Sequence, residues 1–120
     1  KMSSIKSYRD LIVWQKSMIL VTDIYSATKA FPPAEVYGLT NQLRRCAVSI
    51  PSNIAEGYGR NSSGDYKRFL QIAAGSLYEL QTQIEIAFNL KYIDEKNRTE
   101  IISLSIEVDK MLYSIIQKIK

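Results

Sequence analysis

The sequence contains no histidine and a single cysteine. Without histidine, one chain cannot build a catalytic group in which an imidazole activates a serine or a cysteine. One cysteine can form neither an intrachain disulfide nor a cysteine-built zinc site. Carboxylates and tyrosines remain as acid–base groups, but no pair has a diagnostic spacing. We therefore expect a protein that is not an enzyme, with no catalytic residue, no metal and no cofactor.

Proline and glycine are also scarce, with three and five residues among 120, which disfavours long disordered segments. No run approaches roughly 18 uninterrupted apolar residues, and the N-terminal region lacks the apolar core of a signal peptide. A single cysteine suits a reducing compartment. These features predict one domain over residues 1–120, in the cytoplasm and without a membrane anchor.

Apolar residues recur at helical spacing in four blocks, and nowhere do they alternate as in a strand. The first stripe is Leu11, Trp14, Met18, Val21 and Tyr25. The second is Val36, Leu39, Leu43, Cys46, Ile50, Asn53 and Gly57. The third is Leu70, Ala73, Leu77, Leu80, Ile84 and Ala87. The fourth is Ile101, Leu104, Val108, Met111 and Ile115.

Capping patterns and prolines set the expected helix ends. Ser7 with Asp10 forms a capping-box pattern that predicts a first helix from about Tyr8, and the Phe31-Pro32-Pro33 sequence must end it. Pro33 suits the first turn of the second helix, in which Pro51 predicts a kink.

The remaining ends follow the same logic. Gly57 and Gly59 are stop signals for the second helix, Ser62 with Asp65 caps the third, and Asp94 caps the fourth. The connections are short, so neighbouring helices should pack antiparallel. The sequence thus predicts an all-α, up-down-up-down four-helix bundle.

Positive charge is concentrated in the middle of the chain. Residues 36–78 hold five basic and two acidic side chains, which is +3 of the formal +4 for the whole chain. The basic residues are Arg44, Arg45, Arg60, Lys67 and Arg68. They favour a nucleic-acid contact surface, because cationic side chains neutralise phosphates. A solvated surface with structural ion pairs is the alternative, since antiparallel packing brings Arg44 and Arg45 near the level of Glu79.

Other residues point to structural or subunit contacts. Asn53 falls on the second apolar stripe and Glu56 lies near it, so a buried polar network or a subunit contact is the favoured interpretation for them and for Glu79. Cys46 is interpreted as a core residue. The third and fourth helices carry apolar residues on more than one side, which indicates either a broad core face or partner helices.

One stretch is more specific than these patterns. Residues 43–57 read LRRCAVSIPSNIAEG, followed by YKRFL at 66–70 and AGSLYEL at 74–80, with YRDLIVWQ at 8–15 and YGLTNQL at 37–43. These strings resemble a bacterial four-helix-bundle family named for proteins encoded in intervening sequences of large-subunit ribosomal RNA genes. The resemblance extends to about Tyr92.

The resemblance implies a bundle that assembles into a homopentamer. Relatives in this family include the accessory variability determinant of diversity-generating retroelements, a basic pentamer that binds a reverse transcriptase and nucleic acid. We therefore expect a non-enzymatic oligomeric scaffold that associates with RNA or DNA through its basic patch. The alternative is a protein–protein interaction module that binds a polymerase-like or other protein without touching nucleic acid.

Overall fold

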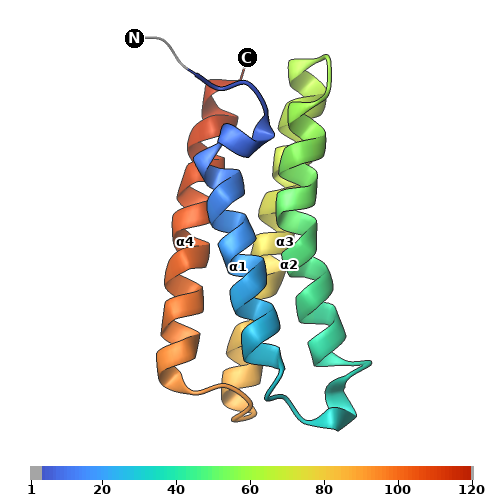
Figure 1. The fold of residues 1–120 in the computed structure, drawn as a ribbon, viewed down its shortest axis with the longest axis vertical. Helices are drawn as coiled ribbons and strands as arrows, with labels where there is room; N and C mark the ends of the chain where they lie inside the picture. Colours follow the sequence, from blue (N-terminus) through green and yellow to red (C-terminus); the bar gives the residue numbers. More distant parts are fainter. Residues whose placement is uncertain (1–3, 120) are drawn as a thin grey trace.

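The computed structural model describes residues 4–119 and measures 47 × 27 × 20 Å. Four helices run along its length: α1 (Ile12–Thr28), α2 (Leu39–Tyr58), α3 (Ser63–Asn89) and α4 (Glu95–Lys118). They alternate in direction, and α4 returns beside α1, so the helices form a closed square (Figure 1). The expected all-α, up-down-up-down bundle is confirmed. None of the helices in residues 4–119 has the length and apolarity needed to cross a bilayer.

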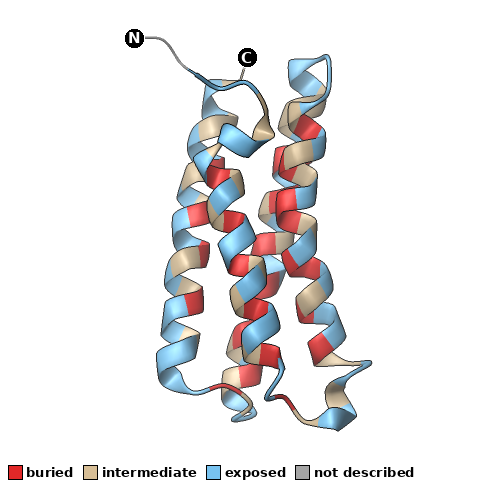
Figure 2. Cartoon of the chain, viewed as in Figure 1, coloured by how far each residue is buried: buried red, intermediate tan, exposed pale blue. Residues whose placement is uncertain are grey.

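The core lies between the inner faces of the four helices, where Figure 2 shows the buried positions. The predicted stripe of α3 is correct at every position, since all six of its side chains are fully buried. In α4, Ile101 and Val108 of the predicted stripe are buried together with Ser105 and Leu112. The regular three- and four-residue spacing of the α3 stripe thus identified the core side, although this helix also carries apolar residues on other faces.

The predicted stripe of α1 is wrong. The buried side chains of this helix are instead Val13, Ser17, Leu20, Ile24 and Thr28. Met18 and Tyr25, which belong to the predicted stripe, are 42% and 39% exposed. The helix is apolar on several faces, so periodicity alone could not identify the inner one. The predicted stripe runs beside the core, along the edge that faces α2.

The starts of α1 and α2 also differ from the prediction. The capping box of Ser7 and Asp10 exists, but it caps a short 3-10 helix, η1 (Tyr8–Asp10). Leu11 is then extended, with φ −76° and ψ 124°, and α1 begins only after it. Pro33 likewise begins a 3-10 turn, η2 (Pro33–Glu35), rather than α2. The local signals at Ser7 and Pro33 therefore predicted that a helical turn begins there, but not that each turn would end after three residues.

The Glu35 side chain in η2 makes hydrogen bonds that stabilise the start of α2. Its carboxylate accepts hydrogen bonds from the Leu39 N–H at 3.0 Å and from the Tyr92 hydroxyl at 2.9 Å. These bonds hold the pKa of Glu35 below its usual range, with the Leu39 N–H as the larger cause. The same carboxylate thus joins η2, α2 and the segment between α3 and α4.

The interior of α2 is continuous through Pro51, which is buried. The bend expected there stays a prediction. The caps of the next two helices are as predicted: the Ser62 side chain accepts from the Asp65 N–H, and the Asp94 side chain accepts from the Asn97 N–H. Gly57, expected as a stop signal, lies inside the last turn of α2 and is buried against α3.

Candidate nucleic-acid interface

The structure divides the five predicted basic residues into two groups. Arg44 and Arg45 lie in the first half of α2, whereas Arg60, Lys67 and Arg68 lie where α2 passes into α3. Arg45 is about 20 Å along the helix axis from the end of α2, at 1.5 Å per residue. The five side chains therefore do not form one compact patch.

Arg44 has a structural role inside the protein. Its Nε donates to the Thr28 hydroxyl at 2.8 Å, and its guanidinium carbon lies 4.5 Å from the centre of the Tyr25 ring. The side chain therefore joins α2 to α1. It makes no ion pair with Glu79, although that pairing was one of the alternatives for Arg44 and Arg45. Arg44 points toward α1, where its bonds lie, whereas Arg45 is exposed on the outer surface of α2.

Arg45 is exposed and, within residues 4–119, makes neither an ion pair nor a hydrogen bond. Its position along the bundle axis, near the level of Glu79, is as predicted. Hydrogen bonds between Ser49 and Ser76 at 2.8 Å and between Gln42 and Gln83 at 3.2 Å set the antiparallel register of α2 and α3. Arg45 and Glu79 are level in this register, but each stands on the outer surface of its own helix.

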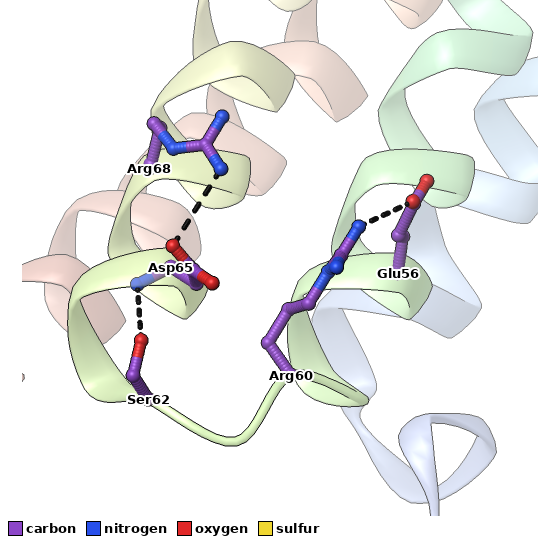
Figure 3. A network of polar contacts seen from close by, with 5 residues as sticks. All are labelled: Glu56, Arg60, Ser62, Asp65 and Arg68. Carbon is purple, nitrogen blue, oxygen red and sulfur yellow. Dashed lines mark hydrogen bonds and ion pairs between the residues drawn. The ribbon is translucent and has the colours of Figure 1, made fainter.

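The second group surrounds the connection between α2 and α3 (Figure 3). Arg60 pairs with Glu56 at 2.9 Å, and Arg68 pairs with Asp65 at 3.6 Å. Both guanidinium groups also lie against the ring of Phe69, at 4.8 and 5.0 Å from its centre. Two arginines at the same end of the bundle thus contact one aromatic ring. We call Arg60, Lys67 and Arg68 the end cluster.

The ion pairs of the end cluster leave its cations available. Each pair joins residues three or four apart on the surface, and exposed pairs of this kind are worth only about 0–1 kcal/mol. A phosphate can displace such a partner or share the guanidinium with it. Lys67, half-buried beside them, has no ion-pair partner within residues 4–119. The end cluster can therefore offer three cationic groups to a polyanion.

The two tyrosines beside the end cluster are structural. Tyr58 and Tyr66 meet edge to face with ring centres 6.1 Å apart, and both are half-buried. Burial, together with the neighbouring Tyr58, raises the pKa of Tyr66. This ring contact packs α2 against α3.

The predicted polar contacts occupy different positions. Asn53 is half-buried and its amide donates to the Ser49 carbonyl at 2.8 Å and to the Ser49 hydroxyl at 2.9 Å. Glu56 is exposed and accepts from Arg60 at 2.9 Å, and Glu79 is exposed and accepts from Gln83 at 3.3 Å. Asn53 thus belongs to a seam between α2 and α3, while the two glutamates lie on the surface.

Sequence reasoning missed the centre of this seam. Gln83 is only 6% exposed, and its amide bonds to Gln42 and Glu79 while its oxygen accepts a weak bond from the Cys46 thiol at 3.7 Å. Burial raises the pKa of Cys46 to about 12, so the thiol is protonated and inert at neutral pH. The sequence signal for this seam was a glutamine, Gln83, directly before Ile84 of the α3 stripe.

The described residues contain no group of three or more Cys, Asp or Glu side chains placed to hold a metal ion. Asp23 and Glu100 face each other across α1 and α4 beside a hollow of about 200 Å³. Burial, and secondarily the charge of Glu100, raises the pKa of Asp23. Two repelling carboxylates in a shallow hollow explain this shift without a ligand.

The comparisons with known proteins agree with the fold. A family model described as 23S rRNA-intervening sequence protein matches residues 9–114. A crystal structure of a protein of unknown function from the S23 ribosomal protein family of Bacteroides thetaiotaomicron superposes with a TM-score of 0.81. It is 28% identical in sequence, and the match covers 89% of this chain and 96% of that chain. A comparison with curated proteins gives no match.

Proposed function

Because the chain belongs to the family of 23S rRNA-intervening sequence proteins, we propose that it is a non-enzymatic oligomeric scaffold that associates with RNA or DNA. The observation that carries this proposal is the end cluster, in which Arg60, Lys67 and Arg68 occupy one end of the bundle. Arg44 is left out of the contact surface, since it is already bonded to α1. Arg45 lies too far along α2 to share a phosphate with the end cluster.

The side chains of the end cluster suit contacts with the phosphate backbone of a nucleic acid and not sequence-specific contacts with its bases. Cationic side chains beside polar loop residues such as Asn61 and Ser62 can bind phosphate oxygens without distinguishing one base from another. Three contacts are weak in a single copy. In an assembly, for which we propose a homopentamer, the cluster would repeat around the ring and the contacts would add as avidity.

The test is binding to a structured RNA and to a DNA duplex over a salt series. Each phosphate contact lowers the slope of log K against log salt by about 0.9 for duplex DNA and about 0.7 for single strands. The triple substitution Arg60→Gln, Lys67→Gln and Arg68→Gln should therefore weaken binding and make the slope markedly shallower. Light scattering of the same sample gives the number of subunits.

A matched control separates a local contact from net charge. Lys29, Lys96 and Lys110 are exposed, make no ion pair within residues 4–119 and lie away from the end cluster. Replacing these three by Gln removes the same charge and should leave the salt slope nearly unchanged. Equal losses in both triple variants would contradict a specific end-cluster contact. Absence of binding at low salt would instead favour the protein-interaction module.

A further inference from the structure

The bundle leaves an open groove on its outer surface between α1 and α2. Trp14, Met18 and Val21 of α1 face Val48 and Pro51 of α2 across a hollow of about 350 Å³. A second hollow of about 530 Å³ continues from Val48 toward Arg45. The apolar stripe that the sequence wrongly assigned to the core therefore lines this groove. We call it the α1–α2 groove.

The charge and ring contacts of the α1–α2 groove restrict what can occupy it. Neither hollow is lined by an acidic side chain, and Arg45 stands unpaired at one end. Two aromatic rings of the groove already carry a cation: Arg44 lies 4.5 Å from the centre of the Tyr25 ring, and Arg9 lies 5.7 Å from the centre of the Trp14 ring. Such rings are poor platforms for bases, whereas aliphatic side chains fit an apolar groove with a cation at its rim.

The outer surface of α3 carries the complementary features. Ile72, Gly75, Glu79, Thr82 and Ile86 are all exposed and follow one another at intervals of three and four residues. Such intervals align side chains along one line of a helix. The two isoleucines are each 42% exposed, and Glu79 has no cation partner within residues 4–119. We call this line the α3 strip.

Gly75 adds an independent observation. A glycine within a helix lowers stability by roughly 1 kcal/mol relative to alanine. No contact within residues 4–119 requires it, because a Cβ at this position would have no atom within 4 Å. Packing within the described part of one copy therefore does not explain the glycine. A helix approaching from another molecule would explain it, since a missing Cβ lets two helices come close.

The spacings of the two surfaces agree. Seven residues separate Arg45 from Ser52, which lines the apolar hollow, and that is about 10 Å along a helix. Seven residues also separate Glu79 from Ile72 on one side and from Ile86 on the other. When Glu79 pairs with Arg45, one isoleucine consequently reaches the apolar part of the α1–α2 groove.

We propose that the α3 strip of one copy docks in the α1–α2 groove of the next, with Glu79 paired to Arg45 across the interface. This inference rests on the oligomeric part of the proposed function and names the faces that join the subunits. The two faces differ, so the contact is head to tail and repeats around a closed ring or along a filament. The pairing of Arg45 with Glu79 is then a contact between copies and not within one chain.

Charge reversal tests the pairing directly. Light scattering gives the mass of the wild-type protein, of Arg45→Glu, of Glu79→Arg and of the double variant. Both residues are exposed, so the fold should survive, and circular dichroism checks this. Each single reversal puts like charges together and should reduce the assembly to smaller species. The double variant exchanges the charges and should restore the wild-type mass.

Lys110→Glu serves as the matched control, because Lys110 is exposed on α4 and makes no ion pair within the described part of the chain. It should leave the mass unchanged. Trp14 is the single tryptophan of the chain and lines the groove, so its emission should shift to the blue as wild-type protein assembles with concentration. The Arg45→Glu variant should show no such shift.

The outcomes separate this inference from the proposed function. A wild-type assembly whose mass both single reversals leave intact would overturn the interface while preserving the scaffold. A monomer at every concentration would overturn both. A mass that collapses on nuclease treatment would show that nucleic acid, and not the α3 strip, joins the copies.

Discussion

Two glycines within helices offer a stringent test of how tightly α2 and α3 pack. A Cβ built on Gly57 would lie 2.7 Å from the Cβ of Phe69 and 3.2 Å from a ring carbon of Tyr66. A Cβ built on Gly75 would meet nothing within 4 Å. Neither glycine has a positive φ, so alanine is compatible with both backbones. The main difference between the two sites is the space available to a Cβ atom.

The Phe69 Cβ is attached to the backbone and cannot swing away, so Gly57→Ala must push α2 and α3 apart. Overpacking of this kind costs about 1–3 kcal/mol. Both substitutions gain about 1 kcal/mol from helix propensity, and this gain cancels when the variants are compared. Gly57→Ala should therefore be about 1–3 kcal/mol less stable than Gly75→Ala, and Gly75→Ala should exceed the parent protein.

The free energy of unfolding is measured by urea titration, with equal protein concentrations because assembly adds to apparent stability. Both substitutions are made in the Arg45→Glu background, so that a contact between copies at Gly75 does not contribute. Equal stabilities of the two variants would refute the argument, because they would show that the α2–α3 contact yields without strain.

Three further predictions concern titratable groups. Asp23→Asn should be more stable than wild type at pH 7, because the raised pKa of Asp23 disfavours its charged form in the fold; the difference should vanish as acid protonates the carboxyl. Glu35→Gln should be less stable at pH 7, because the lowered pKa of Glu35 reports a stabilised carboxylate; this difference should vanish as pH falls through that lowered pKa. Urea titrations across pH 3–8 measure the free energy of unfolding of both variants and of the wild type. A difference of the opposite sign at pH 7, or one that grows in acid, would contradict the prediction. Cys46 should resist a thiol reagent at pH 8 and react after unfolding, and rapid native labelling would contradict its burial.

Two local sequence signals, apolar periodicity and helix-capping residues, predicted parts of α3 and α4 correctly. The six-residue stripe of α3 is buried throughout. Its apolar residues recur at regular helical spacing, and this spacing marks the core side although Ile72 and Ile86 lie on another face. Ser62 and Asp94 cap helices as expected, since a cap depends only on residues two or three positions away. The capping box at Ser7 formed as well, but the extended Leu11 stopped its helix after one turn.

The candidate site was harder to predict, because it depends on which helix each side chain faces. Five basic residues that are close in the sequence became two separate groups once α2 extended between them. Arg44 turned toward α1 because Thr28 and Tyr25 supply its bonds, and neither residue is near it in the sequence.

The sequence by itself determined the helical class, the number of helices and their antiparallel order, because periodicity and short connections are local properties. Only the tertiary structure decided which face of α1 enters the core, and hence that Trp14 and Met18 line an outer groove. It also decided that Arg45 and Glu79 stand level but unpaired on neighbouring helices. The physical reason is that an apolar or charged side chain gains its partner from packing, and packing depends on how all four helices are rotated together.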